Sequence, residues 1–306
     1  MSRDSLPLVS IVTPTYNQAS YLAETICSVL AQDYPNIEYL VLDDGSTDET
    51  PAVLRRFEGH VRWERHANMG QSNTLNKGWR QCRGDYLSYL SSDDRLLPHA
   101  VSTMVRAIES RPDASVVYCD FSLIDKNGIV VKEQCSPDFD HAQLVEELNC
   151  QPGVGVLFRR SVFDQTGGWN PALRKIPDFE FWLRAARIGP FLRVPQALSE
   201  YRVHEESASI RPVPYDRSME IVHTMRSYWQ HDPGSASARR SIGRAHYSAA
   251  KSHAQSGRVL AALRQFVFAC RFRPWQIVQR SAWRGLLSGY LIYRASRSGR
   301  ITGQRR

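Results

Sequence analysis

The chain lacks several features that would assign it to a familiar class of protein at once. It contains neither common glycine-rich phosphate-binding loop, GxGxxG or GxxxxGK followed by Ser or Thr, so a bound nucleotide needs another way to neutralise its phosphates. Its six cysteines form no CxxC pair, which favours free thiols over a disulfide framework or a zinc site. No apolar run approaches the roughly 20 residues that span a bilayer, and residues 1–7 lack the pattern of a secretory signal. We expect a cytoplasmic chain.

Negative charge is missing from the last part of the chain. Residues 234–306 contain 15 Lys and Arg and no Asp or Glu, and subtracting these 15 charges from the net +8 leaves −7 for residues 1–233. Three interpretations stay open for this region: a solvated helical face, docking to an anionic membrane surface, or nucleic-acid binding, the least favoured. Aromatic residues among the arginines favour the membrane over a solvated face; they are Trp275, Trp283, Tyr290 and Tyr293.

Strand-like and helical segments alternate through the first part of the chain. Strands are expected at 8–16, 37–42, 61–65, 86–90 and 115–119, and helices at 21–30, 48–57, 72–82 and 98–110. Crossover helices join parallel strands, so this order predicts an α/β fold with helices on both faces of a mainly parallel sheet. Asn127-Gly128 predicts a hairpin, which makes the sheet mixed. Further strands are expected at 153–158 and 191–203, and a helix at 178–187.

Helical periodicity replaces the strand pattern beyond about residue 205. One predicted helix ends at Pro274 and places apolar residues on one face and arginines off it. The apolar set is Val259, Leu263, Phe266, Val267 and Cys270, and the arginines are Arg258, Arg264, Arg271 and Arg273. We therefore expect a catalytic or binding domain over residues 1–205 and a basic helical region over residues 206–306.

Two acidic pairs, Asp43-Asp44 and Asp93-Asp94, follow predicted strands directly. Open α/β sheets bind ligands at the carboxyl ends of their strands. A divalent cation held by such carboxylates can bridge to a phosphate, because Mg²⁺ and Mn²⁺ prefer oxygen ligands. Each pair could instead serve as a turn and helix cap, as Asp-Asp-Gly-Ser-Thr-Asp would in isolation.

A family resemblance is carried by VSIVTPTYNQASYLAETICSVLAQDYPNIEYLVLDDGSTDET and NMGQSNTLNKGWRQCRGDYLSYLSSDD. Together these segments resemble the family 2 glycosyltransferases of the GT-A fold. The likeness continues to about residue 205 through GVGVLFRRSVFDQTGGW, PDFEFWLRAARIG and LSEYRVHEESAS. It implies a Rossmann-like GT-A domain that moves a sugar from a nucleotide-diphosphate sugar to a hydroxyl acceptor, with inversion.

The resemblance also implies roles for individual residues. On the donor side, Tyr16 would lie against the base, Asp44 would accept a hydrogen bond from it, and Asp93 would face the ribose. Pro14 and Thr15 would line the same loop, and a turn containing Asn68 and Gly70 would close over the nucleotide. Asp94 would ligate Mn²⁺ or Mg²⁺, and His204 resembles a late histidine that reaches the diphosphate or metal in some relatives. Ser91 occupies the first aspartate position of the strict DxD motif.

The catalytic base implied by the resemblance is Asp178, although Pro177 stands where the family often has Glu. A carboxylate opposite the leaving diphosphate can take the proton of the acceptor hydroxyl, and the metal acts as a Lewis acid on the diphosphate. Glu180 competes for this role from the same predicted helix. Trp169 either faces the acceptor or packs in the core.

The resemblance and the basic tail together suggest bacterial surface-polysaccharide or glycolipid synthesis at the cytoplasmic face of the inner membrane. The acceptor would then be a saccharide or a lipid-linked saccharide. A nucleotide-sugar-binding or scaffold protein is the non-enzymatic alternative. A sugar nucleotidyltransferase is a second enzymatic alternative, which is disfavoured because no GxGTRL-type loop stands near the N-terminus.

Overall fold

The computed structural model describes residues 6–134, 136–204, 212–273, 283–288 and 290–291. The chain divides into two compact units. The first comprises the described parts of 1–139, 150–172 and 177–204, and the second those of 140–149, 173–176 and 205–306. The domain boundary expected at 205/206 falls outside the described residues, and it stays a prediction.

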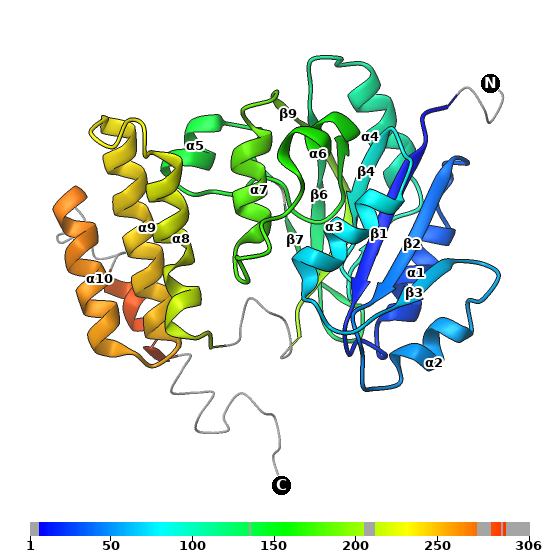
Figure 1. Cartoon of the computed structure of the whole chain (residues 1–306), viewed down its shortest axis with the longest axis horizontal. Helices are drawn as coiled ribbons and strands as arrows, with labels where there is room; N and C mark the ends of the chain where they lie inside the picture. The colour runs from blue at the N-terminus through cyan, green and yellow to red at the C-terminus, as the bar shows by residue number, and fades with distance from the viewer. Residues whose placement is uncertain (1–5, 135, 205–211, 274–282, 289, 292–306) are drawn as a thin grey trace, which may run out of the picture. The chain divides into compact units, whose positions relative to one another are not determined.

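The first unit is built on a nine-stranded sheet with the order β3-β2-β1-β4-β8-β6-β9-β5 and with β7 paired to β6 (Figure 1). The strands are β1 (Val9–Thr15), β2 (Ile37–Asp43), β3 (Arg62–Arg65), β4 (Tyr86–Tyr89), β5 (Arg95–Leu96), β6 (Val116–Ile124), β7 (Val130–Gln134), β8 (Val156–Arg159) and β9 (Phe191–Arg202). Strands β3, β2, β1 and β4 are parallel, as are β6 and β9, whereas the β7, β8 and β5 pairings are antiparallel. The mixed sheet and its hairpin are confirmed.

Helices cover both faces of this sheet, as expected. The core of one face contains residues of α1 (Leu22–Leu30), α2 (Thr50–Arg55) and α4 (Ala100–Glu109), and the other contains residues of α3 (Gln71–Gln81), α6 (Arg160–Thr166) and α7 (Pro177–Ala185). Successive side chains of a strand point to opposite faces, so Ile11 of β1 joins the first core and Val12 joins the second. Both are fully buried, and every residue of β1 is buried, which is why the strand shows no alternation of apolar and exposed polar residues.

Three elements were not expected from the sequence: β5, α5 (His141–Glu146) and α6. They span two, six and seven residues, too few for a periodic pattern to stand out.

The last expected strand region forms one continuous strand, β9. Its register against β6 shifts so that Cys119 pairs Val194 while Asp120 pairs Ala197, which leaves Pro195 without a ladder partner. Proline has no N–H to donate, and such an irregularity accommodates it.

The second unit is helical and contains α5, α8 (Tyr215–Tyr228), α9 (Ala236–Gln255) and α10 (Val259–Phe272), with a further helical turn at 283–288. The expected helical region is therefore present. In the described part of the chain, no helix combines the length and the apolar character needed to cross a membrane. The five cysteines that the structure describes are free thiols, and Cys135 lies outside the described residues.

The face that α10 buries differs from the predicted one. Phe266 is buried as expected, but Leu263 and Val267 are exposed, and the other buried positions are Ala262, Gln265 and Ala269. Phe266 and Ala269 pack in one cluster with Ala250 of α9. The helix therefore turns its small side chains toward α9, which lets the two backbones approach, and this choice depends on the partner rather than on the apolar pattern of α10.

Candidate functional site

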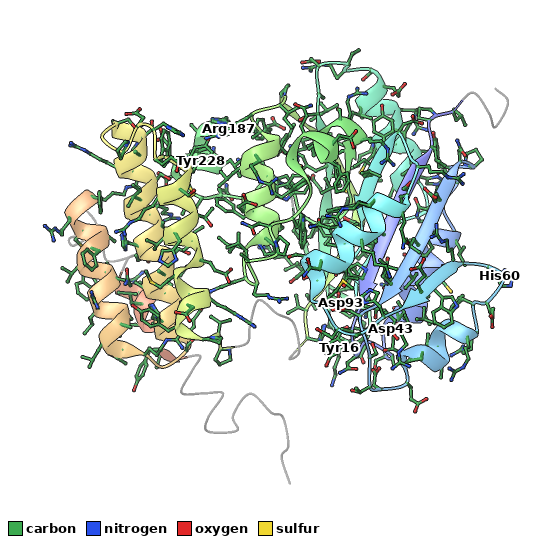
Figure 2. All side chains as sticks on the ribbon, viewed as in Figure 1. Tyr16, Asp43, His60, Asp93, Arg187 and Tyr228 are labelled. Carbon is green, nitrogen blue, oxygen red and sulfur yellow. The ribbon has the colours of Figure 1, made fainter. Side chains whose placement is uncertain are left out.

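The acidic segments meet at one edge of the sheet. Thr15 pairs Asp43 at the ends of β1 and β2, and β4, on the other side of β1, leads into Asp93. Figure 2 shows Tyr16, Asp43 and Asp93 at the same end of the strands. Tyr16 is 48% exposed, whereas Pro14 and Thr15 are buried. Its ring is therefore the accessible part of this segment.

The loop after β1 is fastened to the loop after β2. The Asn17 N–H donates to Ser46 Oγ at 2.9 Å, and the Thr47 N–H donates to Asn17 Oδ1 at 2.8 Å. Asn17 has φ +54°, a left-handed conformation that asparagine tolerates better than most residues. These bonds hold the chain on the C-terminal side of Tyr16 in place.

Asp43 and Asp44 have different environments. Asp43 is fully buried; its Oδ1 accepts the Ser46 N–H at 2.9 Å, and its Oδ2 lies 3.3 Å from Arg65 Nε. This is the turn-forming role that the sequence left open. Asp44 accepts the Met69 and Gly70 N–H groups, one on each oxygen, at 2.7 and 2.9 Å. Since each carboxylate oxygen can accept a second bond, a base contact by Asp44 stays a prediction.

The turn before α3 requires a glycine at position 70. Gly70 has φ +83° and directly precedes the helix, a conformation that residues with a Cβ rarely adopt. Its N–H points at Asp44, while Asn68, two residues earlier, is exposed. The structure therefore brings the predicted turn to the DDGS loop, and its contact with a nucleotide stays a prediction.

Asp93 and Asp94 also differ. Asp94 is 2% exposed and its Oδ1 accepts the Arg202 N–H at 2.9 Å. Burial, and then the negative charge of Asp93, raise the pKa of Asp94 well above its usual value. Asp93 is partly exposed, and its Oδ2 lies 3.0 Å from His204 Nε2. The pairing of Asp93 with His204, 111 positions apart, was not expected from the sequence.

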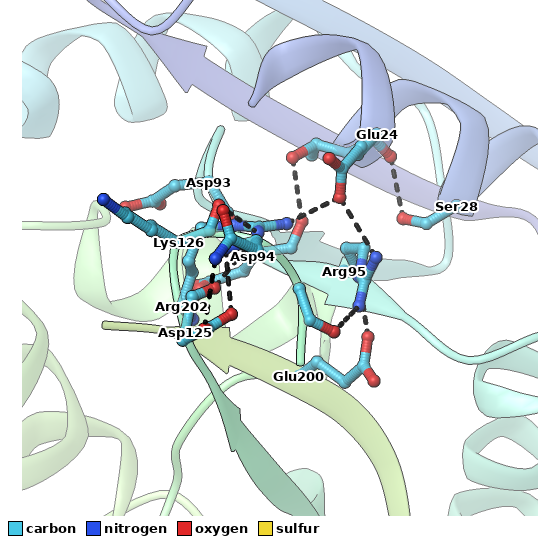
Figure 3. Close-up of polar contacts among 12 residues, drawn as sticks. Glu24, Ser28, Asp93, Asp94, Arg95, Asp125, Lys126, Glu200 and Arg202 are labelled. Atoms are coloured by element: carbon cyan, nitrogen blue, oxygen red, sulfur yellow. Dashed lines mark hydrogen bonds and ion pairs between the residues drawn. The ribbon is translucent and has the colours of Figure 1, made fainter. Parts of the chain in front are cut away.

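Arg202 organises this region (Figure 3) and was missed by the sequence analysis. Its side chain is fully buried and its Nε donates to the Asp93 carbonyl at 2.9 Å. Its two terminal nitrogens donate to Glu24 at 2.7 Å and to the Asp125 and Lys126 carbonyls at 3.3 Å. The one signal that could have revealed it is a charged residue inside the strand LSEYRVH, because a buried arginine requires partners.

Asp178 and Glu180 stand in the first turn of α7 but are not equivalent. Burial raises the pKa of Asp178, against the opposing effect of backbone N–H bonds from Phe179 and from its own amide. Within the described residues Asp178 has no ion-pair partner. Glu180 instead accepts two bonds from Arg184, at 2.8 and 2.7 Å. A carboxylate committed to an arginine is a poor proton acceptor, so the geometry favours Asp178 as a base.

Two aromatic residues line the interior near Asp178. Tyr89 is partly buried, and this desolvation, followed by the negative charge of Asp178, raises its pKa well above the usual value. Trp169 is 4% exposed and packs edge-on against Tyr89, with ring centroids 5.0 Å apart. Its backbone exchanges two hydrogen bonds with the Asn76 amide, at 2.7 and 2.8 Å. Trp169 is therefore a packed core residue in this structure.

Metal-ligating side chains are few here. The described residues contain no group of three or more His, Cys, Asp or Glu side chains arranged to hold a metal ion. Asp93 and His204 nevertheless present an oxygen and a nitrogen 3.0 Å apart. That separation is a hydrogen-bond distance, and it also equals the spacing of neighbouring ligands in an octahedron with bonds of roughly 2.1 Å. The two residues fit a divalent cation that takes its other ligands from water or from a substrate phosphate.

Comparisons with known proteins agree on one family. The model of "Glycosyl transferase family 2" matches residues 10–167, about half of the chain. An uncharacterized glycosyltransferase of Rickettsia felis is 32% identical over 215 residues, which are 66% of this chain and 35% of that protein. The chondroitin synthase of Escherichia coli is 29% identical over 210 residues, 67% of this chain and 30% of that protein. The chain thus matches only a third of the length of these relatives.

Solved structures share the fold. Residues 1–349 of S. aureus TarS, in complex with UDP-GlcNAc, align with a TM-score of 0.68 and 18% identity over 95% of this chain and 92% of that one. The mannosyltransferase PcManGT of Pyrobaculum calidifontis, in complex with GDP-Man and Mn²⁺, aligns with a TM-score of 0.57 and 17% identity over 95% and 88%. At this identity the likeness shows the fold alone, which is GT-A with added C-terminal helices.

Replacing Arg202 tests whether its buried guanidinium holds the site together. Arg202→Gln should lower the free energy of unfolding by roughly 3 kcal/mol or more, because three carbonyls and Glu24 lose a buried cation. Arg95→Gln is the comparison, since Arg95 also binds Glu24, at 3.0 Å, together with Glu200, at 2.7 Å, but is 25% exposed; it should cost less than Arg202→Gln. Urea unfolding measures both. Equal losses would show that burial of Arg202 is not what matters.

Proposed function

We propose, from the premise that the chain belongs to glycosyl transferase family 2, that it transfers a sugar from a nucleotide-diphosphate donor to a hydroxyl acceptor with inversion. The observation that carries this proposal is the meeting of the two acidic segments at the carboxyl ends of β1, β2 and β4. An aromatic ring for a base and carboxylates for a cation lie there, and Asp178, the carboxylate for the proton, acts electrostatically on the same tyrosine, Tyr89, as Asp94 does. The relatives that the chain resembles include proteins solved with UDP-GlcNAc and with GDP-Man, which supports a nucleotide-sugar donor.

The base of the nucleotide would lie against the exposed ring of Tyr16. The loops around that ring are fastened to each other before any donor arrives, so little ordering is left for binding to require. Asp44 has acceptor capacity left for an N–H of the base, and the Asn68 to Gly70 turn that it holds would close the same side.

Asp178 would accept the proton of the acceptor hydroxyl as its oxygen attacks the anomeric carbon. One carboxylate in that position, with no second nucleophilic carboxylate assigned, corresponds to a single displacement, and the anomeric configuration inverts. Its raised pKa brings the carboxyl closer to neutral pH, where a general base is more effective. Arg184 keeps Glu180 out of this role.

Asp93 and His204 would hold the divalent cation, Mn²⁺ or Mg²⁺. The sequence resemblance gave the metal to Asp94 and the ribose to Asp93, but Asp94 is enclosed and already accepts the Arg202 N–H. The geometry favours Asp93, which is partly exposed and faces His204. When bound, the cation supplies Lewis-acid stabilisation of the departing diphosphate. Ser91 replaces a carboxylate here, so the cation would depend more on the histidine.

The acceptor would be a saccharide or lipid-linked saccharide in bacterial surface-polysaccharide or glycolipid synthesis, at the cytoplasmic face of the inner membrane. The bacterial relatives, chondroitin synthase among them, support this setting. A sugar nucleotidyltransferase is disfavoured because the matching family transfers glycosyl groups. A nucleotide-sugar-binding scaffold would bind the same donor without turnover, and an activity assay separates the two.

Donor turnover tests the base. With several nucleotide sugars and Mn²⁺, one donor should release its nucleotide slowly without acceptor, and Asp178→Asn should reduce turnover at least a hundredfold, since general bases contribute about 10²–10⁴-fold. Donor affinity, measured by calorimetry, should stay within a few-fold. Glu180→Gln is the neighbouring control and should keep most activity. If Asp178→Asn turns the donor over at the normal rate, another residue is the base. If the unchanged chain turns over no donor, the result favours the nucleotide-sugar-binding scaffold over the transferase.

The pH dependence follows from the raised pKa of Asp178. A base must be deprotonated to act, so the rate at saturating metal and donor should fall as the pH drops below that raised pKa, at a higher pH than the usual 3.8. The free energy of unfolding changes with pH in the opposite direction. The folded state binds the Asp178 proton more tightly than the unfolded state, so this proton stabilises the fold at low pH and the stabilisation is lost as the pH rises. A rate limb at the ordinary aspartate value would contradict the assignment.

Metal dependence distinguishes Asp93 from Asp94. His204→Ala and Asp93→Asn should each raise the Mn²⁺ concentration needed for half-maximal turnover by tenfold or more, on the order of the effect of losing one ligand contact. EDTA should abolish turnover, and added Mn²⁺ should restore it. Asp94→Asn is the comparison: its amide oxygen can still accept the Arg202 N–H, so it should leave the Mn²⁺ requirement nearly unchanged. A larger metal effect in Asp94→Asn would restore the role that the resemblance gave it.

A further inference from the structure

We propose that the exposed face of α10 is a docking surface for an anionic membrane. The surface consists of the α10 row, defined as Val259, Leu260, Leu263 and Val267, with Arg264 and Arg271 beside it. The proposal deepens the setting suggested for the transferase, but it is argued from the helix alone.

The α10 row is apolar and uncovered. Leu260 is 84% exposed, Val267 is 62% exposed and Leu263 is 45% exposed. At roughly 100° per residue, Leu260 and Val267 lie on the side of the helix opposite Ala262 and Ala269, which are buried. Leu263 lies between that side and Phe266, which is also buried. The helix therefore buries Phe266 and its small side chains and leaves its larger aliphatic side chains exposed. Scattered exposed leucines are common, but a row along one helix face marks an interaction surface.

The arginines beside the α10 row favour an anionic partner. Arg264 and Arg271 are exposed and follow the same side of the helix as Leu260 and Val267. Among the residues that the structure describes, neither forms an ion pair with a carboxylate. The whole stretch from 234 to 306 contains no Asp or Glu, so nothing of opposite sign in the local sequence competes for them. An aliphatic row flanked by arginines is the pattern of a helix that lies in the interface of an anionic bilayer.

A second exposed row continues this character. In the helical turn at 283–288 and just beyond it, Trp283, Leu287 and Leu291 recur every four residues and are 41%, 59% and 60% exposed. Trp283 packs on Phe266 of α10, with ring centroids 4.7 Å apart. Figure 1 shows α10 beside α9. Tryptophan is enriched where one end of a side chain is apolar and the other is wet, as at a membrane interface.

Vesicle binding by the full chain tests the proposal. The chain should sediment with vesicles of phosphatidylcholine and phosphatidylglycerol at low salt, and much less with phosphatidylcholine alone. High salt should weaken binding, because screening shortens the reach of the arginine charges. Leu260→Ser with Val267→Ser, and separately Arg264→Gln with Arg271→Gln, should each weaken the partition coefficient about tenfold or more.

The matched control is Ile129→Ser with Val131→Ser, which removes two apolar side chains that are 62% and 59% exposed in the other unit. It should bind vesicles like the unchanged chain, and circular dichroism should show all variants folded. Equal binding by every variant, or equal binding to neutral and anionic vesicles, would overturn the proposal. The chain could also form a dimer without lipid. If Leu260→Ser with Val267→Ser abolished such a dimer, the α10 row would be the contact surface for a second copy of the chain. If the chain bound a nucleic-acid duplex but not vesicles, the arginines would serve nucleic-acid binding and the membrane proposal would be wrong. Since no readout is activity, failure here leaves the transferase proposal standing.

Discussion

The buried guanidinium of Arg202 is the constraint on which the candidate site depends. A cation removed from water is costly unless its donors are satisfied, and here they reach Glu24 of α1, the Asp93 carbonyl and the two carbonyls of the turn between β6 and β7. The guanidinium also lies 4.7 Å from the centre of the Tyr21 ring. One side chain of β9 thus joins segments that are far apart in the sequence, and the acidic pair between β4 and β5 has its position because Arg202 has its partners.

The carboxylates of the site are held mostly by neutral donors. Asp44 is oriented by two backbone N–H groups, and Asp94 by the Arg202 N–H. The backbone N–H groups themselves carry no full charge, in contrast to Arg184, which is paired with Glu180, and to Arg65, which lies 3.3 Å from Asp43. Burial, and then the negative charge of Asp93, raise the pKa of Asp94 against the opposing effect of the Arg202 charge.

The sequence predicted the long elements and missed the short ones. Strands such as β1 and β2 are apolar runs buried on both faces, and α1 and α4 are amphipathic helices, so their patterns are visible without knowledge of their neighbours. Strand β5 has two residues, and it exists because β9 is there to pair with it. The packing of α10 was predicted on the wrong side, because its apolar pattern alone does not show that α9 accepts small side chains.

The sequence by itself determined which chemical groups follow which strands: an exposed aromatic after β1, acidic pairs after β2 and β4, and a carboxylate at the start of α7. These positions follow from local order along the chain. Only the tertiary structure decided which groups meet. Asp93 faces His204 across 111 positions, and Arg202 reaches Glu24 across 178. Contacts of this separation depend on strand order and register, which arise from the burial of the whole sheet and leave no mark in the spacing of the residues that touch.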